Sequence, residues 1–97
     1  TVEHILPKSP GNGWAKELEN DPELHVDYLH RIGNLCLLSD ANRALGNKPF
    51  SEKKVVFSSS KLNTTRSIAS YDKWGRSEIE QRQNHLAKLA VAEWRFQ

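Results

Sequence analysis

The sequence predicts a small α+β fold. Two short apolar or β-branched runs, at 2–5 and 34–39, suit strands, and helix capping signals occur between and after them. A chain of 97 residues has room for one hydrophobic core, so we expect a single domain spanning 1–97. Because the sequence contains no Met, we also expect it to be a fragment of a longer protein or a processed chain.

The first expected strand carries an acid–imidazole pair, Glu3 and His4, and Pro7 ends it soon afterwards. The stretch that follows is rich in Gly, Pro, Asn and Ser, which favours a loop. A short helix is predicted over 14–19, because the stop signal Asn-Asp-Pro comes directly after it.

A second helix is predicted from Asp21, as its N-cap, to about Arg31, with Pro22 at its first position. Gly33 is expected to end this helix. The apolar run 34–39 is then interpreted as a buried strand, because it is compact and bounded by turn signals.

The middle of the chain favours short helices and a loop. Ser39 or Asp40 is a suitable N-cap for a helix that contains 42–45 and that Gly46 closes. Another helix is predicted over 51–57, and the polar stretch 58–67 is expected to be a loop.

The longest helix is predicted to start at Ser77, with acidic residues in its first turn, and to reach Arg95 in its last turn. An apolar stripe at helical spacing indicates the face that packs on the core. Its members are Ile79, Leu86, Leu89, Ala90 and Trp94.

The net charge of +2 is too small to indicate a nucleic-acid binder by itself. Residues 1–50 contain five Lys and Arg against seven Asp and Glu, whereas residues 51–97 contain nine against five. An acidic half beside a basic half suits a cation site next to a phosphate-binding surface, and it suits an ordinary surface equally well.

The single cysteine, Cys36, lies in an apolar run and has no partner for an internal disulfide. This pattern suits a core position and a reducing compartment, so we expect a cytoplasmic location. No apolar run approaches the roughly 20 residues needed to span a bilayer, and no membrane association is expected.

Three residues have the chemistry that hydrolysis of a phosphodiester needs. His4 offers an imidazole that can take a proton from water, and Glu3 and Asn42 offer oxygen ligands for a divalent cation. Asn34 could orient the His4 ring or pin the intervening loop. A Glu-His pair alone is common, so the pair gains meaning only from the residues that accompany it.

Other site types have less support in the sequence. His25, His30 and Cys36 lack the CxxC or HxxxH spacing of a zinc site. No GxSxG sequence marks a serine hydrolase. We expect His30 to pack or cap at the end of its helix and His85 to be exposed.

The ordered set Glu3-His4-x-x-Pro7, Gly33-Asn34-Leu35 and Asn42 is more specific. With it, and with the stretches "TVEHILP", "HRIGNLCLLSDANRALGNKPFSEKK", "TTR" and W…I…R…LA from Trp74 to Ala87, the chain resembles the HNH nucleases of the His-Me finger (ββα-metal) superfamily. Within it, the chain is most similar to the C-terminal nuclease domain of GmrSD-type modification-dependent restriction enzymes and related phage-defence proteins.

The resemblance implies a ββα-metal core of two short antiparallel strands and a helix, extended by further helices that include the long C-terminal one. It implies that His4 is the general base and that Asn34 supports the loop and the base. It also implies that Asn42 and Glu3, which stands where the superfamily commonly has Asp, are ligands of Mg²⁺ or Mn²⁺. Asn47 is an alternative to Asn42.

The function implied is a metal-dependent DNA endonuclease domain that nicks DNA by one-metal hydrolysis, joined to an N-terminal sensor or NTPase domain. Basic residues near the signature are expected to contact DNA phosphates: Arg43, Lys48, Lys53 and Lys54. One alternative is a catalytically silent DNA- or partner-binding module that retains the fold. Another is a helical interaction domain in which the Glu-His pair is accidental.

Overall fold

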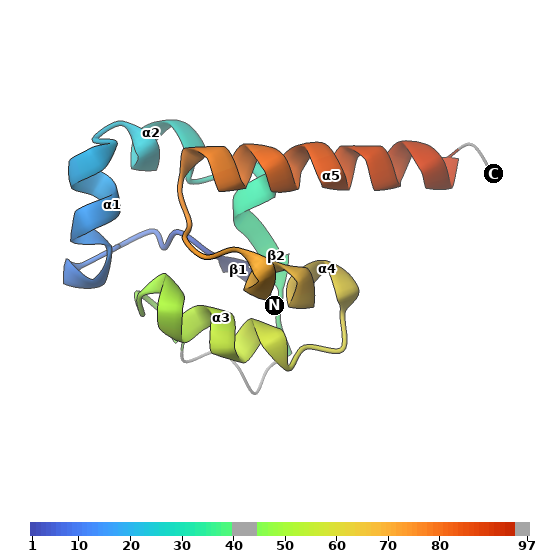
Figure 1. Ribbon diagram of the computed structural model, residues 1–97, viewed down its shortest axis with the longest axis horizontal. Coiled ribbons are helices and arrows are strands. Elements are labelled where there is room, and N and C mark those ends of the chain that lie inside the picture. Colours follow the sequence, from blue (N-terminus) through green and yellow to red (C-terminus); the bar gives the residue numbers. More distant parts are fainter. Residues whose placement is uncertain (40–44, 95–97) are drawn as a thin grey trace.

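The computed structural model describes residues 1–39 and 45–94 of the chain. In these ranges the helices and strands form the α+β fold that the sequence predicts, with two antiparallel strands and a long C-terminal helix (Figure 1). The elements, in chain order, are β1 (Val2–His4), α1 (Ala15–Asn20), α2 (Leu24–Tyr28), β2 (Leu35–Leu37), α3 (Phe50–Ser58), α4 (Asn63–Arg66) and α5 (Arg76–Trp94), with 3-10 turns at Asn12–Trp14, Ile32–Asn34 and Ser67–Ser70.

The two strands pair in a register that sets Glu3 opposite Cys36 and His4 opposite Leu35. Backbone hydrogen bonds continue the pairing past both ends, because Ile5 N–H donates to the Asn34 carbonyl at 2.9 Å and Leu38 N–H donates to that of Thr1 at 2.9 Å. The strand pairing thereby brings together the segment that carries the Glu-His pair and the segment that carries Asn34, although residues 5–34 separate the two strands in sequence.

Large aromatic side chains fill the core beneath the sheet. The Trp74 ring stacks on Phe50 at 5.4 Å between centroids and meets Tyr71 edge-on at 5.3 Å. Aromatic pairs of this kind contribute about 0.5–1.5 kcal/mol each beyond the burial of their area. The other buried apolar residues come from nearly every element: Ile5, Leu6, Trp14, Leu24, Tyr28, Cys36, Leu38, Leu45, Phe57, Ile68 and Ile79.

Only the first turns of α5 belong to this core. Ile79 is fully buried and Arg82 nearly so, whereas Leu89 and Val91 are 45% and 53% exposed. Figure 1 shows the later turns of α5 extending beyond the other elements. The expectation that the whole apolar stripe packs on the core is therefore wrong for Leu89 and Ala90, because nothing in the described chain covers the helix there.

Gly33 has a packing role rather than the helix-ending role that the sequence suggested. A Cβ atom at this position would collide with the carbonyl oxygen of Ile79 in α5. The Arg82 guanidinium reaches the same turn and donates to the carbonyls of Gly33 and Leu35 at 3.1 and 2.6 Å. Close contact of α5 with this turn fixes the segment that leads into β2.

Three local predictions differ from the structure. Asp21 does not cap α2 with its side chain, because its carboxylate pairs with Arg76 at 2.8 Å. The polar stretch expected to be a loop contains α4, which Thr65 anchors by donating its hydroxyl to the Leu37 carbonyl at 2.9 Å. Ser77 lies within α5, where Ile79 N–H bonds to the Gly75 carbonyl instead.

Two further expectations concern the helix of the ββα-metal motif and membrane association. The short helix expected over 42–45, which a ββα-metal motif requires, falls largely on residues outside the described ranges. No helix of the described chain is both long and apolar enough to cross a membrane.

Candidate active site

A cleft of about 550 Å³ lies at the end of β1. It brings together residues from three parts of the chain: the strand, the loop after it and the turn before α3. Its lining residues are Val2, Glu3, His4, Pro7, Lys8, Ser9, Gly46 and Asn47. An imidazole, a carboxylate, an ammonium and an amide therefore border one space.

Glu3 and His4 are neighbours, so regular strand geometry would direct their side chains to opposite faces of the sheet. The strand ends at His4, and the next three residues turn into the core as buried positions. Because His4 is the last strand residue, its ring is not held to the regular alternation. Both side chains can then border the same cleft, as the sequence analysis required.

Lys53 of α3 forms an ion pair with Glu3. Its Nζ lies 2.8 Å from Glu3 Oε2 and also donates to the carbonyls of His4 and Ile5, at 2.9 and 3.0 Å. Burial lowers the pKa of Lys53, and the Glu3 carboxylate opposes this shift. The expectation that Lys53 contacts DNA does not fit this placement, because the side chain is fully buried and its ammonium is bonded to three protein oxygens.

His4 is held in a state that suits a general base. Partial burial, followed by the positive charge of Lys8 and the nearby ring of His30, lowers the pKa of His4 below its usual 6.5. Glu3 opposes this shift, and Lys53 adds to it. The shift favours the neutral ring at pH 7, and a neutral imidazole can accept a proton.

A second imidazole contacts the first. His4 Nε2 lies 3.3 Å from Nδ1 of His30, and the two rings meet at 79° with their centroids 5.3 Å apart. His30 is exposed and follows α2. It does more than pack or cap at its helix end, which is what the sequence suggested.

Asn34 lies outside the cleft and is fully buried. Its Oδ1 accepts from Leu6 N–H at 2.8 Å and from the Trp74 indole at 3.0 Å. Its Nδ2 donates to the carbonyls of Leu6 and Leu29, at 3.0 and 2.9 Å. The side chain makes no direct contact with the His4 ring, and it supports the loop that follows the base.

The remaining predicted site residues are dispersed. Asn42 and Arg43 lie outside the described residues. Lys48 is exposed next to Asn47, so it remains available for an anionic ligand. Lys54 is half-buried, and its ammonium donates to the Tyr71 carbonyl at 2.8 Å, which directs it away from the cleft.

The cleft contains one residue that the sequence analysis missed, Lys8, and one that it gave only as an alternative ligand, Asn47. Lys8 was not proposed at all, although its position four residues after His4 in a turn makes it a natural neighbour of the base. The His25 ring donates its Nε2–H to the Lys8 carbonyl at 2.9 Å and so holds this turn. Asn47, the alternative to Asn42, lines the cleft together with Glu3.

The donors at the cleft fit a hard divalent cation, because carboxylate and amide oxygens are the ligands that such ions prefer. Glu3 supplies the carboxylate, and its Oε2 is shared with Lys53. Asn47, in the turn before α3, supplies an amide. Within 1–39 and 45–94, no three His, Cys, Asp or Glu side chains are grouped so that they could bind a metal by themselves.

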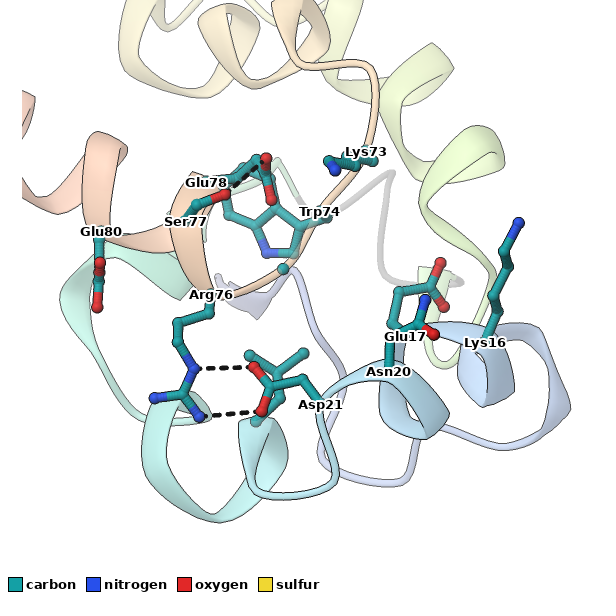
Figure 2. A pocket seen from close by; sticks show the side chains of 12 residues that line it. Lys16, Glu17, Asn20, Asp21, Lys73, Trp74, Arg76, Ser77, Glu78 and Glu80 are labelled. Atoms are coloured by element: carbon teal, nitrogen blue, oxygen red, sulfur yellow. Dashed lines mark hydrogen bonds and ion pairs between the residues drawn. The ribbon is translucent and has the colours of Figure 1, made fainter.

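A second cleft, of about 470 Å³, lies where α1 meets the start of α5 and contains none of the predicted site residues (Figure 2). Arg76 bridges it by a bidentate pair with Asp21, at 2.8 and 3.0 Å, and Ser77 donates to Glu78 at 3.0 Å. Its one arginine is paired with Asp21, and no imidazole lines it. It is a less suitable place for hydrolysis than the cleft at β1.

Comparison with protein families identifies the family of the chain. A family model described as GmrSD restriction endonucleases, C-terminal domain, matches residues 1–89. No curated protein and no solved structure matches the chain. The matched range includes the whole of the cleft at β1 and the segment with Asn34. Because the match extends over nearly the entire sequence, the chain belongs to the family of C-terminal domains of GmrSD restriction endonucleases.

Proposed function

We propose that this chain is a divalent-metal-dependent DNA endonuclease domain of the HNH type, acting at the cleft beside β1. The observation that carries the proposal is the juxtaposition of Glu3 and His4 at one cleft. The lowered pKa of His4 agrees with it. Membership of a restriction endonuclease family supports the reaction class. DNA is accordingly the proposed substrate.

In this mechanism His4 takes a proton from a water molecule, which attacks the phosphorus of the scissile phosphodiester. Lys8 borders the same cleft, and its ammonium can hold a nonbridging phosphate oxygen. Lys48, exposed beside the cleft, extends this positive surface. His4, Lys8 and Lys48 thus supply the base and the first contacts to the substrate.

Glu3 would be the carboxylate ligand of Mg²⁺ or Mn²⁺, and Asn42 or Asn47 the amide ligand. Bound there, the cation would supply charge neutralisation at the phosphate and at the leaving 3′ oxygen. Lys53 holds one Glu3 oxygen at 2.8 Å, so Oε1 is the atom we assign to the metal. The ββα-metal arrangement of the core belongs to the same proposal.

One such site cuts one strand in each event, so the domain is proposed to nick duplex DNA and leave a 5′ phosphate. Recognition of the target is proposed to reside in an N-terminal sensor or NTPase domain of the full protein. A cytoplasmic location is part of this proposal, and buried Cys36 agrees with a reducing environment.

The test is the nicking of supercoiled plasmid by the parent chain and by His4→Ala, each with Mg²⁺, with Mn²⁺ and with EDTA. His85→Ala is the matched control, because it removes an exposed imidazole from α5. We expect metal-dependent nicking by the parent and by the control. Removal of a general base should slow the His4→Ala variant about a hundredfold or more.

Equal nicking by the parent and His4→Ala would refute the proposed function. A chain that shifts DNA on a gel, keeps that binding in EDTA and gives no metal-dependent product would instead be a silent binding module. A chain that neither binds nor cuts DNA would be an interaction domain.

A further inference from the structure

We propose that His30 is a positioning residue for the base: it accepts a hydrogen bond from His4 Nε2–H and leaves Nδ1 of His4 as the nitrogen that takes the proton from water. The inference deepens the proposed function and rests on it. Its structural basis is the contact of 3.3 Å between His4 Nε2 and His30 Nδ1.

The geometry of the two rings allows this hydrogen bond. An imidazole N–H and an imidazole lone pair both lie in the plane of their own ring, so the rings can rotate about the line that joins the two nitrogens. An angle of 79° between the planes is therefore compatible with an N–H···N bond. The distance of 3.3 Å is long for such a bond in the resting protein, and catalytic hydrogen bonds commonly shorten when substrate binds.

The direction of the bond decides which nitrogen of His4 is basic. A neutral imidazole carries one N–H, and its other nitrogen is the acceptor. If His4 donates from Nε2, its Nδ1 has a free lone pair and can deprotonate water. If His30 donates from Nδ1, the proton of His4 must be on its own Nδ1, and that nitrogen cannot act as a base. The general-base role therefore requires His4 to be the donor.

The same bond becomes stronger as the reaction proceeds. When His4 takes the proton, it becomes a cation, and its Nε2–H···Nδ1 bond to His30 becomes charge-assisted. An interaction that strengthens toward the transition state accelerates the chemical step, whereas uniform binding does not. His30 thus has a catalytic effect through His4, without contact with the substrate.

Buried Asn34 holds the two imidazoles next to each other. One end of its amide donates to the Leu29 carbonyl, directly before His30. The same amide bonds to both the N–H and the carbonyl of Leu6, two residues after His4. His4 and His30 are 26 residues apart in sequence, and this buried amide, together with the pairing of β1 and β2, joins the segments that carry them. The pairing is therefore built into the fold and is not a chance contact of surface side chains.

Two histidines in contact can also be the beginning of a zinc site. A zinc site needs further ligands, and no group of three His, Cys, Asp or Glu side chains in the described part of the chain is placed to bind a metal.

The test compares His30→Ala with His30→Asn. The Oδ1 atom of Asn occupies nearly the position of histidine Nδ1 and can accept the same hydrogen bond, whereas Ala cannot. We expect His30→Ala to reduce kcat about 10- to 100-fold, the range typical for loss of a group that orients a functional imidazole. DNA affinity should change less than about twofold, His30→Asn should recover most of the rate, and His85→Ala should match the parent.

A second measurement does not depend on nuclease activity. Nitrogen-15 NMR of the imidazoles in the metal-free chain reports which ring nitrogen carries the proton. We expect His4 to carry it on Nε2 in the parent and in His30→Asn, and to lose this preference in His30→Ala. A parent His4 protonated on Nδ1, or unchanged kcat and tautomer in His30→Ala, would overturn the inference.

The two measurements separate failure of the inference from failure of the proposed function. If the parent does not cut DNA, the proposed function fails, and the tautomer of His4 still decides whether His30 orients the ring. If His4→Ala abolishes cutting and His30→Ala leaves it intact, the proposed function stands and the role of His30 is refuted.

Discussion

Among single residues, Asn34 supports the segments around the site without lining the cleft. Its amide uses both hydrogen-bonding groups twice and serves Leu6, Leu29 and Trp74. A buried amide with all of its partners present fixes the backbone strongly, because loss of the side chain would leave several buried polar groups unsatisfied. Its influence on the proposed base, His4, is therefore transmitted through the backbone of the loop after His4.

The lowered pKa of His4 gives a prediction for the pH dependence of nicking. Only the neutral ring is a base, so activity should be present at pH 7 and should fall as the pH drops through a pKa below 6.5. The groups that face the ring are Lys8, His30, Lys53 and Glu3, and the first three favour the neutral form. The measurement is the single-turnover rate between pH 5 and 8 at saturating Mg²⁺ and DNA. An acidic limb centred at or above pH 6.5 would contradict this description of the site.

The sequence predicted Glu3 and His4 as neighbours at a strand end, and the structure brings both to one cleft. The position of Lys53 was not predictable in the same way. A lysine in a run of Glu and two Lys resembles a solvated helix face, and only the packing of α3 against β1 buries its ammonium. The contact between His4 and His30 was equally hidden, because it depends on how Asn34 joins two distant segments.

At the scale of elements, α5 has a buried part, which contributes to the stability of the core, and an exposed part, which contributes little. Its first turns pack on the turn that contains Gly33, through Ile79 and Arg82. Its later turns expose Leu89 and Val91. A hydrophobic stripe read from the sequence cannot reveal where the partner surface ends, and this is why the stripe was predicted correctly at Ile79 and wrongly further along.

This division gives a stability prediction for two substitutions in one helix. Ile79→Ala removes a fully buried side chain, so it should lower the free energy of unfolding by about 2–5 kcal/mol. Leu89→Ala removes a side chain that is 45% exposed, so it should cost less than about 1 kcal/mol. Urea unfolding of both variants and the parent measures the difference. Equal losses would show that the later turns of α5 are covered in solution.

Helix and strand types were easier to predict than helix ends. The helices near 14–19 and 51–57 were confirmed because their stop and start signals are local. The N-cap role of Asp21 failed because a bidentate ion pair with Arg76, 55 residues away, competes for the same carboxylate. The polar stretch before α5 was predicted as a loop, since the tertiary anchor of α4, from Thr65 to β2, has no local sequence signal.

At the scale of the whole molecule, the two-stranded sheet of the described chain borders the cleft with β1 and contributes Cys36 of β2 to the core. Figure 1 shows β1 and β2 between α3 on one side and α5 on the other. α3 reaches the strand end through Lys53, and α5 reaches β2 through Arg82. The strand that borders the cleft is therefore held by α3 directly and by α5 through its partner strand.

The exposed lysines at the cleft give a prediction for DNA binding. Lys8→Ala should weaken binding to all sequences alike and reduce the slope of log K against log salt by about 1, because one phosphate contact is lost. Lys88→Ala, on the part of α5 that extends away from the core, is the matched control. Fluorescence anisotropy with a labelled duplex at several salt concentrations provides the slopes. Identical slopes for the parent and Lys8→Ala would remove Lys8 from the proposed substrate surface.

The central claim is that the imidazole and the carboxylate at the end of β1 hydrolyse a phosphodiester. The most direct measurement is single-turnover cleavage of an end-labelled duplex in Mg²⁺, with analysis of the product ends, for the parent and His4→Ala at equal DNA occupancy. The account predicts 5′-phosphate and 3′-hydroxyl ends and a rate at least about a hundredfold lower for the variant. Ends of the opposite polarity, or equal rates for the two proteins, would contradict it.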